Sequence, residues 1–263
     1  MPESAPANPH PAASLFAGRV ADYAAARPSY PPAAIDLVVR DLPAHTQAID
    51  LGCGTGISTR ALAGRGLAVI GVDPNTEMLA AAAAAIAADA GTIEYRLGDE
   101  SLASVAAASV DLVACFQSFH WLDPATARRS FARVLKPGGR VALVWNLRVL
   151  GDPAGDDYAE AVGVAPAEAR YGIEAPDGPL FEEDPPAFRA IARERFANPQ
   201  SLDEAGLVAR ARSASYFPRD ALLASKVERD LRTLFSRHAH PSSLGPRLRL
   251  GQETLVVIAE VAQ

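Results

Sequence analysis

The stretch that decides the fold is residues 48–56, Ala-Ile-Asp-Leu-Gly-Cys-Gly-Thr-Gly, where an apolar run ends in glycines spaced G-x-G-x-G. Glycine accepts a positive φ and has no Cβ, so it suits a sharp turn from a strand into a helix and lets a ligand approach the main chain. A second apolar run, Leu67–Val72, follows and is closed by Asp73. This order predicts the first βαβ unit of a parallel sheet, with a ligand at the glycine turn.

The acids beside the glycines indicate the kind of ligand. Dinucleotide sites use G-x-G-x-x-G and place a pyrophosphate on a helix N-terminus. Here Asp50 lies two residues before Gly52, where a carboxylate would repel pyrophosphate but can bind an ammonium group directly or through water. S-adenosylmethionine carries an ammonium and a sulfonium and has no phosphate, which favours it as the cofactor. Asp73 can accept both ribose hydroxyls, a role that would also fit a nicotinamide dinucleotide.

Composition limits the class of partner. The 263 residues are 49% hydrophobic and carry a net charge of -6, so we expect a large core and no attraction to nucleic acid. No apolar run reaches membrane-spanning length, so we expect no membrane partner; residues 1–13 lack a signal-peptide pattern and are expected to be a disordered tail. Cys53 and Cys115 have no metal-ligand spacing, which predicts no metal site and a reduced, cytoplasmic protein.

Strands alternate with helices over residues 45–147, which predicts a doubly wound parallel sheet that binds the cofactor. The strands expected there are Gln47–Leu51, Leu67–Val72, Ile93–Leu97, Val110–Phe116 and Arg140–Trp145. The helices expected between them are Ile57–Gly64, Thr76–Ala90 and Pro124–Val134. A turn is expected at Lys136–Gly139, because proline and two glycines follow one another there.

The flanks are predicted to complete a single domain over residues 14–263. Residues 14–44 are expected to form helices, the second of them Ala33–Leu42, and residues 148–240 to form a cap of short helices and later helices. The elements expected in and after that cap are the strand Phe188–Phe196, the helices Asp203–Ser213 and Asp220–His238, and the last strand Thr254–Glu260, which lies in residues 241–263.

Over about residues 45–147 the chain resembles the class I S-adenosylmethionine-dependent methyltransferases. The matching motifs, in the family's order, are residues 49–56, Asp73, Gly98-Asp99, Asp111 and the run Leu135–Gly139. The resemblance implies an α/β fold with a Rossmann-like, doubly wound, seven-stranded and mostly parallel sheet. It also implies that residues 14–44 form a helical N-terminal lid and that residues 148–240 include a helical cap insertion.

The same resemblance implies the cofactor contacts. The glycines would bring the main chain to the methionine part, Asp50 would help bind its amino group, and Asp73 would bind the ribose. Asp99 would accept the adenine amino group, in a segment that reads Gly98-Asp99-Glu100-Ser101 where many relatives read Gly-x-Ala-Glu. The residues expected to bind the cofactor are Asp50, Gly52, Cys53, Gly54, Gly56, Asp73, Pro74, Asn75, Met78, Asp99, Glu100 and Gln117.

The flanks are similar to a small-molecule branch of the family that includes trans-aconitate methyltransferase-like proteins. The residues that carry this likeness are Tyr23, residues 27–31 (Arg-Pro-Ser-Tyr-Pro), residues 116–123 (Phe-Gln-Ser-Phe-His-Trp-Leu-Asp) and residues 213–216 (Ser-Ala-Ser-Tyr). This likeness implies a small molecule as the methyl acceptor.

His120 is the leading candidate for the chemistry, because it follows the strand Val110–Phe116 at the edge where α/β proteins bind ligands. It can act as a general base for a hydroxyl or amine, or donate a hydrogen bond to a carboxylate that needs no base. It can equally orient Trp121 or cap the following helix. We expect His120 and Trp121 to bind the acceptor.

Tyr23, Arg27 and Tyr30 lie in a segment that can fold over the cofactor. Arg27 suits a carboxylate, and the tyrosines can exclude water or donate hydrogen bonds. The same segment can also be a rigid connector whose aromatic rings pack on the sheet. We assign Tyr23 and Arg27 to catalysis, and all three residues, with Trp145, to acceptor binding; core packing is the alternative for Trp145.

These inferences predict a methyltransferase that moves a methyl group from S-adenosylmethionine to an oxygen, carboxylates included, or to a nitrogen or carbon of a small molecule. One alternative is a protein that binds the cofactor and transfers nothing. The other is a nicotinamide-dependent oxidoreductase, which would require the G-x-G-x-x-G spacing that the glycine turn lacks.

Overall fold

The computed structural model describes residues 27–87, 91–163, 177–182, 187–214 and 216–262. Tyr23, the expected tail and the first expected lid helix lie outside these residues. Among the residues that are described, no helix is both long and apolar enough to cross a membrane.

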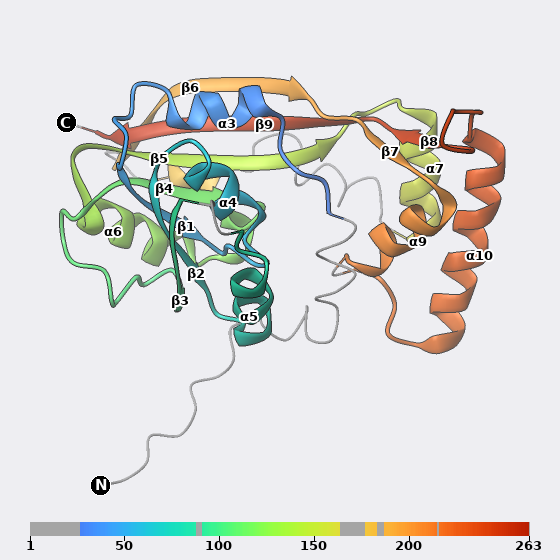
Figure 1. Cartoon of the computed structure of the whole chain (residues 1–263), viewed down its shortest axis with the longest axis horizontal. Helices are drawn as coiled ribbons and strands as arrows, with labels where there is room; N and C mark the ends of the chain where they lie inside the picture. The colour runs from blue at the N-terminus through green and yellow to red at the C-terminus, as the bar shows by residue number, and fades with distance from the viewer. Residues whose placement is uncertain (1–26, 88–90, 164–176, 183–186, 215, 263) are drawn as a thin grey trace, which may run out of the picture.

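Seven strands form the central sheet (Figure 1). In sheet order they are β3 (Thr92–Leu97), β2 (Ala68–Asp73), β1 (Gln47–Leu51), β4 (Val110–Phe116), β5 (Leu135–Arg148), β9 (Gln252–Val261) and β6 (Phe188–Ala197). The first five are parallel, whereas β9 runs antiparallel to both β5 and β6. Because β1 lies between β2 and β4, the order of the strands reverses there, and the carboxyl ends of β1 and β4 form the switch point at which such sheets bind ligands. The expected fold class is confirmed.

Within the described residues, four helices pack along the sheet: α3 (Pro32–Val39), which lies mainly against β9 and β6, α4 (Ile57–Ala63), α5 (Thr76–Ala84) and α6 (Pro124–Val134). The Asn75 side chain caps α5, and the Asp123 side chain caps α6, because each accepts main-chain N–H groups of the first turn. Helix α4 differs, since it starts directly from Gly56 in the left-handed region and has no side-chain cap. A helix start without a cap leaves N–H groups that a ligand can satisfy.

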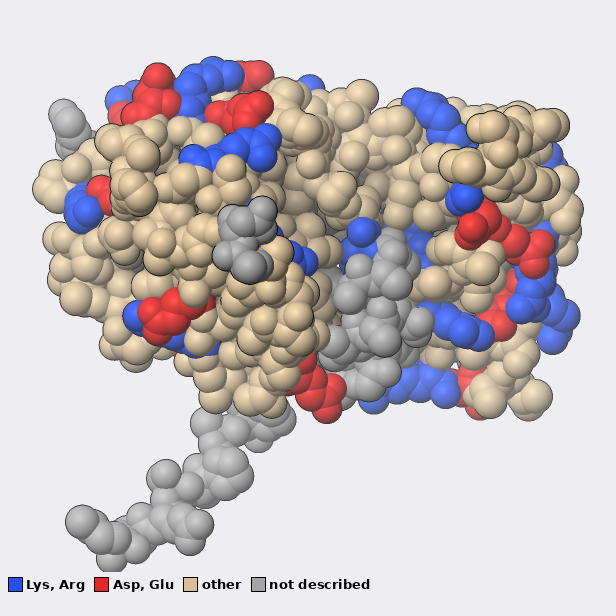
Figure 2. All heavy atoms as spheres, viewed as in Figure 1, with Lys and Arg blue, Asp and Glu red and all other residues tan. Residues whose placement is uncertain are grey.

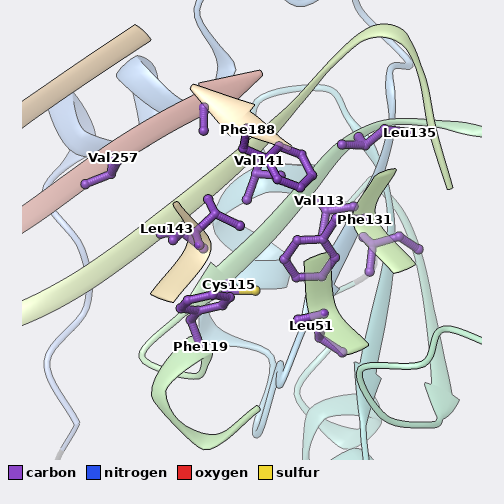
Figure 3. Close-up of a cluster of buried hydrophobic side chains, with 14 of the residues drawn as sticks. Leu51, Val113, Cys115, Phe119, Phe131, Leu135, Val141, Leu143, Phe188 and Val257 are labelled. Carbon is purple, nitrogen blue, oxygen red and sulfur yellow. The ribbon is translucent and has the colours of Figure 1, made fainter. Parts of the chain in front are cut away.

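The core lies on both faces of the sheet, because alternate residues of a strand point to opposite sides. On one face, Val113 and Cys115 of β4 pack with Phe119 and with Phe131 of α6, as Figure 3 shows. On the other face, alternate residues such as Leu112 pack with α3 and α4. The sheet is therefore buried on both sides, and its ligands can reach it only at the strand ends.

A third apolar cluster belongs to the cap, which lies beyond the carboxyl end of β5 (Figure 1). Its elements are α7 (Pro153–Ala161), β7 (Gln200–Leu202), α9 (Glu204–Arg212), α10 (Ala221–His238) and β8 (Leu248–Leu250). Two short 3-10 helices, η1 (Phe119–Trp121) and η2 (Gly178–Leu180), complete the described elements. The β7 and β8 ribbon was not predicted from the sequence.

Two predicted boundaries lie furthest from those of the structure. The expected turn at Lys136–Gly139 is part of β5, which starts at Leu135: Leu135 pairs with Val110, and Arg140 then pairs with Leu112. The proline and glycines therefore make a bulge inside the strand rather than ending it. Helix α5 ends at Ala84, six residues before its expected end at Ala90. Alanine favours a helix but does not fix where it ends, because a run of alanines offers the same residue at every possible end.

Candidate active site

The glycine turn needs glycine for conformation and for space. Gly52, Gly54 and Gly56 have φ of 72°, 52° and 75°, in the left-handed region that other residues avoid. A Cβ on Gly52 would lie 2.4 Å from the Ser118 Cβ, and one on Gly56 would lie 2.1 Å from the Tyr95 hydroxyl oxygen. The turn is thus held against β3 and against the segment after β4, two contacts that the sequence did not reveal.

Asp50 lies under this turn, fully buried, at the end of β1. Its Oδ2 accepts hydrogen bonds from Ser58 Oγ at 2.7 Å and from Thr59 Oγ1 at 2.6 Å. Its Oδ1 is buried and has no hydrogen-bond donor among the described residues. Burial raises the pKa of Asp50 to about 6, against the lowering effect of the two hydroxyls. This carboxyl is therefore prepared for one more donor, which a cationic ligand would supply.

Asp73 ties the glycine turn to the next strand. Its Oδ2 accepts the Gly54 N–H at 2.8 Å, and its Oδ1 accepts the Asn75 N–H at 2.8 Å. A carboxylate has about four acceptor positions, so it can bind several donors at the same time. Asp73 thus stands at the end of β2, held by the main chain, where it can accept hydroxyl groups of a ligand.

The other expected cofactor residues after β2 help to build the helix start. Asn75 accepts the N–H groups of Glu77 and Met78 with its side-chain oxygen, at 2.9 and 3.1 Å. Met78 is buried, and Pro74 is half-buried between Asp73 and the cap residue. The structure brings these residues to the carboxyl ends of β1 and β2, which we call the cofactor edge. Their direct contact with a cofactor stays a prediction.

Asp99 and Glu100 follow β3. Asp99 is exposed and its Oδ1 accepts the Ser101 N–H at 3.0 Å, while Glu100 Oε1 accepts the Asp123 N–H at 3.1 Å. Asp99 therefore lies at the open side of the edge, where a nucleobase could approach it. Glu100 instead connects this loop to the start of α6.

Cys53 is buried in the wall of the site. Burial, followed by the charges of Asp50 and Asp73, raises the pKa of its thiol well above the usual value. The thiol therefore stays protonated and acts as a small apolar group. Within the described part of the chain, no group of three or more His, Cys, Asp or Glu side chains could hold a metal ion.

A small cavity of about 30 Å³ lies between the glycine turn and the segment that precedes α3. Arg27, Tyr30, Gly52, Gln117 and Asn146 are among the residues that line it. Gln117 adopts a positive φ of 56°, and its Nε2 donates to the Asn146 main-chain oxygen at 3.0 Å. Residues far apart in the sequence are thus brought together at the carboxyl ends of β1, β4 and β5.

Tyr30 and Arg27 have different surroundings. The Tyr30 ring meets the Phe116 ring edge to face, with centroids 4.8 Å apart, so Tyr30 also packs on the sheet. Arg27 Nη2 donates to the Ser213 main-chain oxygen at 3.1 Å, which joins the N-terminal segment to the end of α9. Tyr23, the third expected residue of this group, lies outside the described residues.

His120 and Trp145 form a pair. Trp145 is 2% exposed, in the core, and its Nε1 donates to His120 Nδ1 at 3.4 Å. Because an indole nitrogen can only donate, the neutral His120 ring must carry its proton on Nε2. The Trp121 ring lies 4.9 Å from His120, between centroids. The geometry therefore presents Nε2–H of His120 as a hydrogen-bond donor.

The surroundings of His120 favour the neutral ring. Desolvation by nearby protein, followed by the Arg27 charge, lowers its pKa to about 4. The residue is nevertheless exposed at the rim of the site, and water weakens such a shift. A shift in this direction keeps His120 uncharged at neutral pH, in the tautomer that Trp145 selects.

Residues 49–143 match a family described as a methyltransferase domain. An uncharacterized methyltransferase of Mycobacterium tuberculosis (strain ATCC 25618 / H37Rv) is 47% identical over 137 residues, which cover 51% of this chain and 52% of that protein. A ubiquinone biosynthesis O-methyltransferase of Stutzerimonas stutzeri (strain A1501) is 37% identical over 100 residues, or 37% of this chain and 43% of that protein. This chain spans about half the length of the curated relatives it matches.

Among solved structures, the fold is similar to that of an S-adenosylmethionine-dependent methyltransferase from Geobacter sulfurreducens in complex with S-adenosyl-L-homocysteine. The TM-score is 0.53 at 18% identity, covering 93% of this chain and 97% of that chain. The family match contains the glycine turn, Asp50, Asp73 and His120. Residues 49–143, which build most of the parallel part of the sheet and the glycine turn, therefore match a methyltransferase domain.

Proposed function

We propose that this protein transfers the methyl group of S-adenosylmethionine to a small molecule that binds between the carboxyl edge of the sheet and the cap. The observation that carries the proposal is the Asp50 Oδ1, which is buried beneath three glycines of positive φ and has no donor among the described residues. An unsatisfied buried acceptor is costly, and an ammonium group, directly or through water, would satisfy it. The same site would not suit a pyrophosphate, whose charge matches that of Asp50.

The neighbouring groups fit the rest of the cofactor. Asp73 can accept the two ribose hydroxyls, because its carboxylate is oriented by the N–H groups of Gly54 and Asn75. Asp99 is exposed after β3, and its carboxylate can accept a hydrogen bond from an exocyclic amino group. When bound, the cofactor supplies an electrophilic methyl group on a sulfonium, and its thioether leaves without needing a proton.

The protein's own contribution to the reaction is alignment. With its proton on Nε2, His120 would donate a hydrogen bond to the acceptor and fix the attacking atom, rather than remove a proton from it. An acceptor that is already ionised, such as a carboxylate or an acidic phenol, suits this arrangement. The likeness to a ubiquinone biosynthesis O-methyltransferase supports oxygen, ahead of nitrogen or carbon, as the methylated atom.

Calorimetry with S-adenosylhomocysteine tests the cofactor site. We expect Asp73→Ala to weaken binding by roughly 100-fold, because two hydrogen bonds to a charged acceptor are lost. Asp111→Ala is the matched control, since Asp111 pairs with Lys136 near the start of β4, at the amino edge of the sheet. Equal affinity of the Asp73→Ala variant and the unaltered protein would rule out this site.

Turnover separates the possible activities. The protein is incubated with S-adenosylmethionine labelled in its methyl group and with a panel of carboxylates, phenols, amines and cell extract. Label that mild base releases as methanol would identify a carboxyl ester, whereas base-stable label would identify an ether, amine or carbon product. Cofactor binding without any labelled product would favour the protein that binds without transfer, and tight binding of a nicotinamide dinucleotide would favour the oxidoreductase.

A further inference from the structure

Arg210, in helix α9 of the cap, carries a buried positive charge. The residue is 8% exposed, and its Nε has no hydrogen-bond acceptor in the part of the chain that the structure describes. Its guanidinium lies over the Tyr158 ring, with its carbon 5.4 Å from the ring centroid. Across the described ranges, no carboxylate comes within ion-pair distance of Arg210. A buried charge is normally paired, because leaving water is costly and a cation–π contact offsets only part of that cost.

Acidic residues of the cap pair with exposed arginines rather than with the buried Arg210. Arg212, two residues after Arg210, is exposed and pairs with Glu228 at 2.6 Å. Exposed Arg232 approaches Glu204 at 3.5 Å. Exposed pairs contribute little to stability, and this distribution of charge places neither Glu228 nor Glu204 against Arg210. It leaves the one desolvated guanidinium of α9 available to a ligand.

A series of contacts connects Arg210 with the cavity beside the glycine turn, where we place the methyl acceptor. Tyr158 of α7 is buried, and its hydroxyl lies 3.3 Å from that of Tyr216, which is 45% exposed. The Ser213 hydroxyl donates to the Arg210 main-chain oxygen at 2.7 Å. The Ser213 main-chain oxygen accepts a hydrogen bond from Arg27 Nη2 at 3.1 Å. Arg27 in turn lines the cavity beside the glycine turn. Figure 2 shows Lys and Arg atoms where the cap meets the core.

Electrostatics couples the same groups. The charges of Arg210 and Arg27 both act on Tyr158, where they oppose the rise in its pKa that burial and Tyr216 cause. Arg27 also contributes to the lowered pKa of His120. The two guanidinium groups therefore lie close to the phenols and the imidazole, in a region where hydrogen-bond donors are concentrated.

We infer that Arg210, with Tyr158 beside it and Arg27 toward the cofactor, binds an anionic oxygen group of the methyl acceptor, a carboxylate or a phosphate. This inference rests on the proposed function and names the substrate class of that site. A planar guanidinium matches two oxygens of either group and binds them strongly where water is excluded. The ligand would supply the counter-ion that Arg210 lacks in the fold.

The test is calorimetric titration of the full chain, saturated with S-adenosylhomocysteine, with succinate and with inorganic phosphate at constant ionic strength. Arg210→Met keeps the length and apolar character of the stem, and Arg212→Met is the matched control. We expect at least one anion to bind, with an affinity that falls tenfold or more in Arg210→Met and is unchanged in Arg212→Met. The anion that binds distinguishes a carboxylate from a phosphate acceptor.

A thermal unfolding scan without anions provides the second readout. A purely structural Arg210 predicts that Arg210→Met lowers the midpoint, whereas an unpaired charge held for a ligand predicts an equal or higher midpoint. Anion binding that is absent from the unaltered protein, or that is equal in both variants, overturns the inference. Failure of S-adenosylhomocysteine to bind would instead overturn the proposed function, so the two failures can be told apart.

Discussion

The cofactor edge and the cap differ in where their polar groups find partners. At the edge, the carboxylate of Asp73 and the hydroxyl of Ser118 bond to main-chain groups of the neighbouring turn and strand. In the cap, Arg210 is buried against the Tyr158 ring, and no carboxylate of the described residues pairs with it. The cofactor edge is therefore fixed largely by main-chain contacts, with Asp50 Oδ1 left for the proposed cofactor, whereas the cap leaves Arg210 for the proposed acceptor.

The largest expected effect comes from filling the glycine turn. Gly52→Ala combines a positive φ with a Cβ that would lie 2.4 Å from the Ser118 Cβ, an atom next to the main chain that cannot move away cheaply. We expect a loss of ~3 kcal/mol or more in the free energy of unfolding, from strain and overpacking together. Denaturant unfolding measures it.

Gly66→Ala is the control for this variant. Gly66 also has a positive φ, of 89°, but a Cβ there would meet nothing within 4 Å. It should therefore lose only the conformational part, about 1–2 kcal/mol. Equal losses of unfolding free energy at the two glycines would mean that Ser118 does not hold the turn at Gly52. The description of the cofactor edge as fixed by main-chain contacts would then be wrong.

The next effect concerns Asp50, a buried charged group of the glycine turn that resembles Arg210 in lacking a full set of partners among the described residues. Asp50→Asn can keep the bonds from Ser58 and Thr59 while it removes a buried charge. We expect it to raise the free energy of unfolding at pH 7 by up to ~3 kcal/mol, because the pKa is raised from 3.8 to about 6. It should weaken S-adenosylhomocysteine binding by ~10- to 100-fold.

The pH dependence gives this prediction its sign. A raised pKa means that the folded protein binds the extra proton between about pH 4 and 6, so Asp50 makes the unfolding free energy fall as pH rises through that range. The advantage of Asp50→Asn should be complete above about pH 6 and vanish below about pH 4. Urea melts at pH 4, 5, 6 and 7 measure it, and an advantage that did not change with pH would contradict the burial of an ionised Asp50.

The sheet was predictable where local signals were strong. Val110–Phe116 and Pro124–Val134 match the structure residue for residue, because an apolar run marks the first and Asp123 with Pro124 marks the start of the second. The start of β5 was wrong, since proline and glycine indicate a turn and only the pairing of Leu135 with Val110 keeps that segment in the strand. Tertiary contacts decided such boundaries.

The site divides in the same way. The glycine turn, Asp50 and Asp73 form a short pattern in which spacing alone implies proximity. No sequence pattern indicated that Arg210 or Tyr158 belongs to the site. Arg210 lies two positions from Arg212, and such closely spaced charges predict a solvated helix face. Only the packing of α7 against α9 and α10 shows that one of these arginines is buried.

The smallest expected effect distinguishes a donor from a base at His120. His120→Gln keeps a donor near the position of Nε2, so we expect kcat to fall only about tenfold, less than the ~100-fold or more that loss of a general base costs. The lowered pKa also predicts that kcat of the unaltered protein shows no inflection near pH 6.5. An inflection there that is absent from His120→Gln would instead mean that His120 acts as a base. Its Nδ1 would then accept a proton from the acceptor and lose the hydrogen bond from Trp145. His120 would then transfer a proton as well as bind the acceptor, and the difference between the cofactor edge and the acceptor side would include the chemistry as well as the binding.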